Sequence, residues 1–139
     1  MTNRILILPL LLLVACSQSF YGQGKKLAGQ ERYEEAIENF YKEISANPQS
    51  ADAWRELGIA YYKSGDMQKA TESLQQAQAI APGARAYLFL GLIAENGEDY
   101  QGAIDAYANA LQLNPSGKTK NTIRAHLDRL IHHKIAKEV

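Results

Sequence analysis

The side chains that most often carry chemistry are few and poorly grouped in this sequence of 139 residues. The three histidines are His126, His132 and His133. On a helix, His132 and His133 point about 100° apart and His126 lies roughly 10 Å away, so one metal ion cannot bind all three. There is no glycine-rich phosphate loop and no spacing that indicates a Ser-His-Asp triad. The sequence therefore predicts a protein that is not an enzyme and that uses neither a metal nor another cofactor.

The single cysteine, Cys16, offers a different chemistry. It follows an apolar run over residues 5–14, which is too short to span a bilayer but fits a secretory signal peptide. The run ends in LVAC at residues 13–16, which resembles the lipobox of bacterial lipoproteins. The resemblance implies that residues 1–15 are removed and that Cys16 is acylated, for example with palmitate; two or more acyl chains anchor a protein stably. The alternative is an ordinary signal peptide with an unrelated cysteine near its cleavage site.

The residue after the cysteine bears on location. In Gram-negative lipoproteins an aspartate at that position retains the protein in the inner membrane, so Ser17 implies the outer membrane, with the protein facing the periplasm. Residues 16–19 would then form the lipidated N-terminus and a short tether, roughly 10 Å long when extended.

The elements that would position a binding site come from a repeated unit. Residues 51–83 read as two helices joined by a turn, each with one apolar stripe. A proline ends the unit, because the residue before a proline is pushed out of helical backbone angles. The stripes and the proline are Trp54, Leu57, Gly58 and Tyr61, then Ala70, Leu74 and Ala77, then Pro82.

The same pattern recurs 34 residues earlier and 33 residues later. Its period and its residues resemble the tetratricopeptide repeat, W-x2-L-G-x2-Y, then A-x3-F, then P. The resemblance implies an all-α fold, a right-handed superhelix of three helix-turn-helix repeats over residues 17–115. The repeats span 17–50, 51–83 and 84–115.

Both ends of the array depart from the pattern. In the first repeat, Gln23 and Glu43 replace an apolar and a small residue, which predicts a looser or partly wet terminal repeat. After the third repeat, residues 116–120 read as a turn. Residues 116–139 as a whole are predicted to form an amphipathic capping helix, whose apolar stripe is Ile123, Leu127, Leu130, Ile131 and Ile135.

A second stripe on each first helix lines the concave groove in proteins of this family. By the repeat shifts, the groove residues are predicted to be Tyr21, Lys25, Arg55, Ile59, Tyr62, Leu88 and Leu92. Apolar side chains beside cations predict a protein or peptide ligand. The alternative is that these side chains only pack against neighbouring helices. The set does not match the Lys/Asn carboxylate clamp of chaperone-binding relatives, so capture of a C-terminal tail is not predicted.

The charge balance excludes a strong field, since Lys and Arg together number 15 and Asp and Glu also number 15. Nucleic acid is therefore not a predicted partner. The predicted function is that of a membrane-anchored scaffold or adaptor that binds one or more proteins of the bacterial cell envelope. The alternative is a structural subunit of a pilus or secretion system, which would form homo-oligomers through the apolar helix at 87–94. Burial of that helix between the second repeat and the capping helix is the favoured interpretation.

Overall fold

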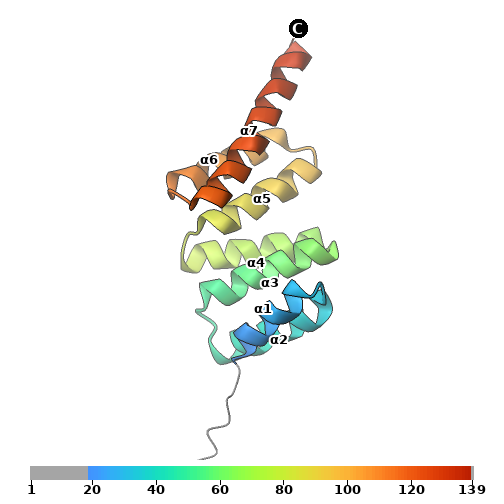
Figure 1. Ribbon diagram of the computed structural model, residues 1–139, viewed down its shortest axis with the longest axis vertical. Helices are drawn as coiled ribbons and strands as arrows, with labels where there is room; N and C mark the ends of the chain where they lie inside the picture. Colours follow the sequence, from blue (N-terminus) through green and yellow to red (C-terminus); the bar gives the residue numbers. More distant parts are fainter. Residues whose placement is uncertain (1–18, 139) are drawn as a thin grey trace, which may run out of the picture.

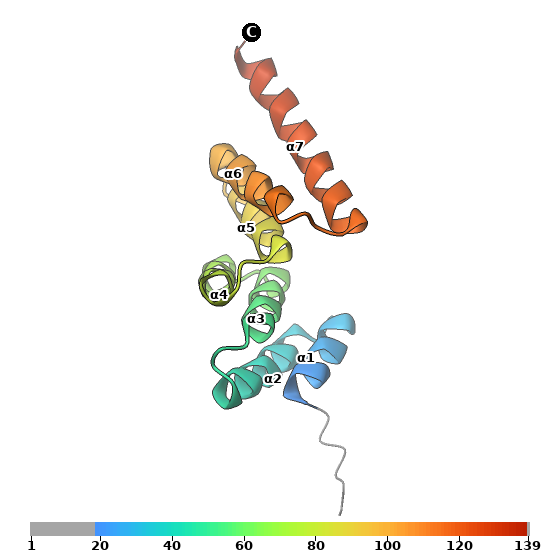
Figure 2. The same cartoon turned by 90° about the vertical axis from the view of Figure 1, so that its left-hand side faces the viewer.

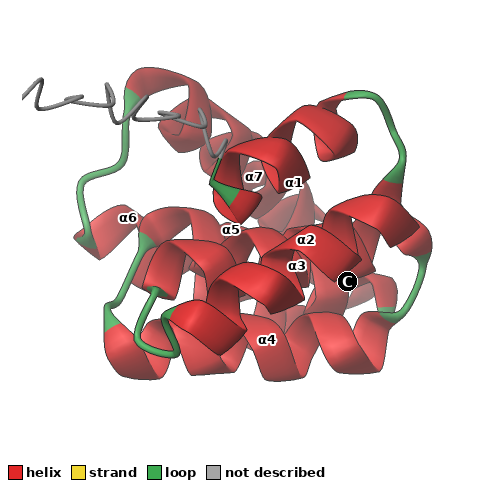
Figure 3. Cartoon of the chain, turned by 90° about the horizontal axis from the view of Figure 1, so that it is seen from below, coloured by secondary structure: helices red, strands yellow, loops and turns green. Residues whose placement is uncertain are grey.

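Seven helices follow one another in the part of the chain that the computed structural model describes, residues 19–138 without the side chains of 134, 135, 137 and 138. They are α1 (Phe20–Gly29), α2 (Tyr33–Ala46), α3 (Ala51–Ser64), α4 (Met67–Ile80), α5 (Ala84–Asn96), α6 (Tyr100–Gln112) and α7 (Gly117–Glu138). Helix pairs stack along one axis (Figure 1), and short loops join them (Figure 3). The predicted all-α superhelix is confirmed. The predicted signal peptide over residues 1–15, Cys16 and Ser17 lie outside the described residues.

Each pair packs through a glycine on its first helix. A Cβ added to Gly58 would lie 2.6 Å from Cγ of Leu74 and 3.0 Å from the carbonyl oxygen of Ala70, so only glycine allows this approach of α3 to α4. Gly24 faces Phe40 and Gly91 faces Tyr107 in the same way. A large side chain on the second helix of each pair thus fills the space that the glycine leaves, which is how neighbouring helices reach short interaxial distances.

The turn inside each repeat uses left-handed backbone at one equivalent position. In the second repeat this residue is Gly65, with φ of 95°. The first and third repeats place Glu31 (φ 62°) and Glu98 (φ 60°) there. A non-glycine residue pays about 1–2 kcal/mol for this conformation, so the geometry of the array, rather than local preference, sets these two turns.

The first repeat is tied together by the polar residue that breaks the pattern. The Glu43 carboxylate in α2 accepts a hydrogen bond from the backbone N–H of Tyr21, at 3.2 Å, in the first turn of α1. Gln23 is half-buried beside the exposed Lys26 on the surface of α1. A terminal repeat of a solenoid needs a polar outer face of this kind, because that face is exposed to solvent.

The last helix, α7, begins at Gly117, so the predicted turn over 116–120 is wrong from that residue onward. Ile123, Leu127 and Leu130 pack against α5 and α6. The prediction that Ile131 joins this stripe is wrong: its side chain is 47% exposed, because one helical step of about 100° turns it away from the face that Leu130 occupies. The far end of α7 extends beyond the other helices (Figure 1).

No helix between residues 19 and 138 combines the length and the apolar character that a bilayer crossing requires. In Figure 2 the second helices α4 and α6 lie toward one side of the stack, while α1 and α7 lie toward the other.

Candidate functional site

A hollow of about 270 Å³ opens between α1, α3 and the start of α5, and we call it the inner hollow. Its buried apolar lining residues, which form its floor, are Ile59, which is 8% exposed, and Ala60; Glu56 is also buried there, at 6%. The full lining is Lys25, Ala28, Gly29, Tyr33, Glu56, Ile59, Ala60, Lys63 and Arg85. The floor is therefore apolar and small, and most of the rim is charged.

Two lysines on the rim carry charges that the protein does not neutralise. Lys25 and Lys63 are exposed, and no carboxylate lies within ion-pair distance of either in the described chain. Each ammonium group lies over a tyrosine ring of its own helix, 5.4 Å from the ring centre for Lys25 on Tyr21 and 5.9 Å for Lys63 on Tyr62. These aromatic contacts hold the lysine side chains at the mouth of the hollow.

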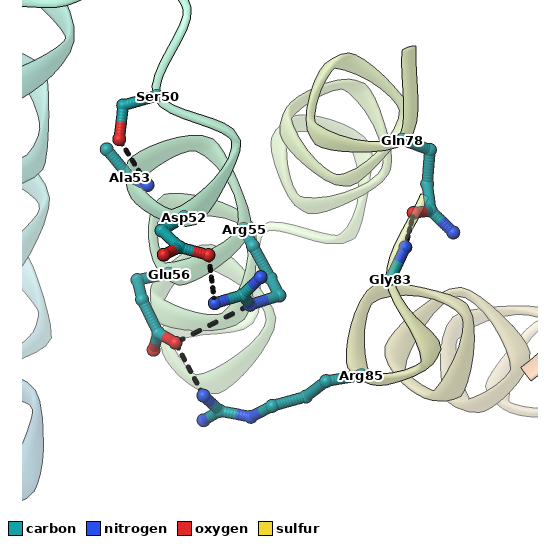
Figure 4. Close-up of polar contacts among 8 residues, drawn as sticks. All are labelled: Ser50, Asp52, Ala53, Arg55, Glu56, Gln78, Gly83 and Arg85. Carbon is teal, nitrogen blue, oxygen red and sulfur yellow. Dashed lines mark hydrogen bonds and ion pairs between the residues drawn. The ribbon is translucent and has the colours of Figure 1, made fainter. Parts of the chain in front are cut away.

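A buried glutamate, Glu56, lies between the guanidinium groups of Arg55 and Arg85 (Figure 4). Its Oε1 accepts a hydrogen bond from Arg85 at 2.5 Å and lies 3.8 Å from Nε of Arg55. The other end of the Arg55 guanidinium pairs with Asp52 at 2.6 Å. Both ion-pair partners of Arg55 therefore lie on its own helix, α3, while the half-exposed Arg85 links α5 to α3.

The two tyrosines of the predicted groove serve mainly to pack neighbouring helices. Tyr62 meets the edge of Phe89 in α5, with ring centres 5.2 Å apart, and Tyr21 packs on Phe40. Burial raises the pKa of the Tyr21 hydroxyl, and the nearby carboxylates of Glu56 and Asp52 raise it further. The predicted set therefore splits: Lys25 and Ile59 line the inner hollow, whereas both tyrosines and Arg55 support it.

The third repeat contributes Leu88 and Leu92, but α7 covers them. Leu88 is 8% exposed, and both side chains belong to the cluster that includes Ile123 and Leu130 of α7. The rest of the apolar segment 87–94 also packs inside the array. Its side chains Phe89, Leu90 and Ile93 contact the core that α3, α4 and α5 share. This segment is buried or half-buried along its whole length, in agreement with the favoured interpretation from the sequence.

A polar cluster centred on Glu95 fastens α7 over this part of the array. The Glu95 carboxylate accepts hydrogen bonds from the Tyr107 hydroxyl at 2.8 Å and from the Arg129 guanidinium, and its Oε2 lies 2.8 Å from Nδ1 of His126. Burial favours the neutral acid, but the bonds from His126, Tyr107 and Arg129 outweigh it and lower the pKa of Glu95. Burial and the Glu95 charge raise the pKa of Tyr107.

Sequence reasoning missed Glu56, Lys63 and the partners of Glu95. Glu56 and Lys63 lie one residue from predicted groove positions, so a wider stripe on α3 would have included them. From the sequence, His126 is considered only as a metal ligand, whereas in the structure it lies against Glu95, as a buried polar group requires. Residues 19–138 bring no three His, Cys, Asp or Glu side chains together in an arrangement that could hold a metal ion.

Comparison with known sequences identifies the fold. A tetratricopeptide repeat model matches residues 17–85 and a second one matches 84–116. The chain belongs to the tetratricopeptide repeat (TPR) family. Members of this family are protein-interaction modules.

One sequence relative and two solved structures are similar to this chain. Anaphase-promoting complex subunit 3 of Schizosaccharomyces pombe is 31% identical over 79% of this chain, which spans only 17% of that protein. The Arabidopsis OM64 TPR domain has a TM-score of 0.77 at 22% identity, covering 86% of this chain and 97% of its own. The first TPR of Spaghetti (RPAP3), bound to an HSP90 peptide, has a TM-score of 0.70 at 22% identity, covering 81% and 90%.

Proposed function

We propose that this TPR chain is a lipid-anchored adaptor of the bacterial cell envelope that holds one or more envelope proteins in its inner hollow. The observation that carries the proposal is the pairing of an apolar floor at Ile59 and Ala60 with two exposed lysines that lack carboxylate partners in the described chain. Such a surface gains from a ligand that supplies both the missing charge and an apolar side chain.

The partner is best described by its chemistry. An acidic residue would pair with Lys25 or Lys63, and a small apolar residue beside it would cover Ile59. Glu56 already holds Arg85 at 2.5 Å, so the arginine is less available to a ligand than the lysines are. A solved TPR domain with this fold carries a bound peptide, which supports a segment of extended chain as the occupant.

The anchor forms the second half of the proposal. The lipobox at residues 13–16 supports acylation of Cys16 after removal of residues 1–15, and Ser17 supports the outer membrane, facing the periplasm. A tether of a few residues would keep α1 close to the bilayer, so the hollow would meet partners that are themselves at the membrane.

Site-specific photocrosslinking in cells tests the hollow. A photoreactive residue at position 63 should capture envelope proteins, and the same residue at Lys118, exposed on α7, should not. Lys25→Glu should abolish the product from position 63, because the new carboxylate would repel the acidic residue of the partner that Lys25 is proposed to attract. Identical products from both positions, or a product that Lys25→Glu leaves intact, would contradict the assignment.

Membrane fractionation tests the anchor independently of the hollow. Cys16→Ser should move the protein to the soluble fraction and end incorporation of labelled palmitate, whereas Ser17→Asp should shift it to the inner membrane. A Cys16→Ser protein that remains in the membrane fraction would show that lipid on this residue is not the attachment.

A further inference from the structure

A second hollow, of about 370 Å³, lies between the second helices of the first two repeats. In the described chain, α2 and α4 each pack against α3 but not against each other, so a valley remains over α3. We call it the outer hollow; it is lined by Tyr41, Trp54, Lys69, Glu72, Ser73 and Gln76. Its residues are separate from those of the inner hollow.

Two aromatic rings of the outer hollow are held in fixed positions. The Tyr41 hydroxyl shares a hydrogen bond of 2.9 Å with the Tyr61 hydroxyl, although the Tyr41 side chain is 45% exposed. Trp54 Nε1 donates to the carbonyl oxygen of Pro48, also at 2.9 Å. Because their polar atoms are already used, these rings offer a ligand their π-faces and little else.

The charges around the rings are not balanced. Lys69 lies 3.1 Å from Asp66 and over the Tyr61 ring, so its charge is met within the protein. The Glu72 carboxylate accepts a hydrogen bond from Gln68 at 3.1 Å, and the described chain places no cation within ion-pair distance of it. The outer hollow therefore combines aromatic faces with one carboxylate that lacks a cation.

The next valley along the array shows that repeat packing does not require this arrangement. By the repeat shifts, the valley between α4 and α6 has Gln75 in place of Tyr41 and Ala94 in place of Tyr61, while Tyr87 stands in place of Trp54 and Asp105 keeps the charge of Glu72. The second valley thus keeps one aromatic residue and the acid. The exposed ring of Tyr41 is what distinguishes the first valley.

From these observations we propose that the outer hollow binds an arginine side chain of a partner protein. The guanidinium would lie on the faces of Tyr41 and Trp54 and pair with the Glu72 carboxylate, the combination that suits a planar and weakly hydrated cation. This site does not depend on the inner hollow or on the membrane anchor, so it stands or falls separately from the proposed function.

The tryptophan provides a direct readout, because Trp54 is the only tryptophan in the chain. The full chain is titrated with a blocked glycine-serine peptide that carries one central arginine, and with the same peptide carrying citrulline, which has the same shape without the charge. The arginine peptide should change the Trp54 emission saturably and the citrulline peptide should not.

Variants identify the groups that bind. Glu72→Gln, on the exposed surface of α4, should weaken the arginine peptide roughly fivefold or more. Tyr41→Gln, which copies the second valley, should abolish the response, while Tyr41→Phe should keep most of it. Asp105→Asn is the matched control in the second valley and should leave the affinity unchanged.

Several results would overturn the assignment. They are equal binding of the arginine and citrulline peptides, an affinity that Glu72→Gln does not alter, and no response to the arginine peptide at all. Saturable binding of a polyproline peptide in place of the arginine peptide would also overturn it, and would assign the aromatic wall to proline-rich segments.

Discussion

The two halves of the inner face carry equivalent residues but differ in what covers them. Around α1 and α3 the face is open, with an apolar floor at Ile59 and, at its rim, two lysines that form no ion pair among the described residues. Around α5 the equivalent stripe, Leu88 and Leu92, lies beneath α7 and is buried with it. The charged groups differ in the same sense, since no carboxylate of the described residues pairs with Lys25 or Lys63, whereas Glu95 has three hydrogen-bond partners.

This contrast shows how a short array can separate stability from binding. A solenoid must bury the apolar side of its last repeat, and here α7 does so with side chains that a longer array would take from a fourth repeat. Residues in the covered half should therefore govern stability, and residues in the open half should govern partners. Substitutions in the two halves can test that division.

The largest effect is expected from the covered half. Ile123→Ala should lower the free energy of unfolding by about 3 kcal/mol, because this fully buried side chain joins α7 to α5 and α6 and the cavity cannot collapse completely. Urea unfolding followed by circular dichroism measures the change. Ile131→Ala makes the same substitution two turns along α7 at a site that is 47% exposed, and should cost less than about 0.5 kcal/mol. Equal losses from the two variants would contradict the docking of α7.

A smaller effect, with a distinct dependence on pH, is expected at Glu95. Glu95→Gln should cost about 2 kcal/mol at neutral pH, since it weakens three hydrogen bonds to a charged group. The wild-type pKa of Glu95 is below its ordinary value of 4.5 when folded, so its contribution is complete above pH 4.5 and is lost as the pH falls through the lower folded value.

Unfolding measured between pH 7 and pH 3 checks both the size and the sign. The wild-type protein should lose more stability over this range than Glu95→Gln does. Glu38→Gln, at an exposed glutamate of α2, is the control and should follow the wild-type curve. A wild-type profile that Glu95→Gln reproduces would show that the cluster does not fasten α7.

The smallest effect on stability is expected in the open half. Replacing Lys25 and Lys63 together by alanine should change the free energy of unfolding by less than about 0.5 kcal/mol, because both side chains are exposed and form no ion pair in the described chain. The same double variant should lose partner binding, measured by photocrosslinking from position 33, because Tyr33 also lines the inner hollow. A large loss of stability would place these lysines in the packing of the array and end the distinction between the halves.

The sequence predicts the fold well because the residues that define it act locally. Within one helix pair, the two helices pack closely at Gly58 and Ala70, and the second helix ends before Pro82. These features recur at a fixed spacing, so they can be recognised without knowing any contact between distant residues. The same reasoning fails at Ile131, where the apolar type fits the stripe but the helix rotation turns the side chain outward.

The site is predicted less well because it depends on how neighbouring repeats meet. The spacing that identifies Lys25 and Ile59 cannot show that Glu56 pairs with Arg85 of the next repeat, or that α7 covers Leu88. Nor does it reveal the hydrogen bond that the backbone N–H of Tyr21 donates to Glu43, which joins the two helices of the first repeat. Contacts between repeats are set by three-dimensional stacking, and periodicity alone does not report them.

The stacking of neighbours also has a consequence for how the chain folds. The ion pairs that link successive elements close short stretches, 29 residues from Glu56 to Arg85 and 34 from Glu95 to Arg129. Chains with contacts that are close in sequence fold quickly, because little loop entropy is lost before each contact forms. Each helix pair can fold and pack against the preceding pair as soon as its own residues are free to do so. A polypeptide that emerges from a narrow channel N-terminus first can therefore fold progressively, without waiting for its last helix.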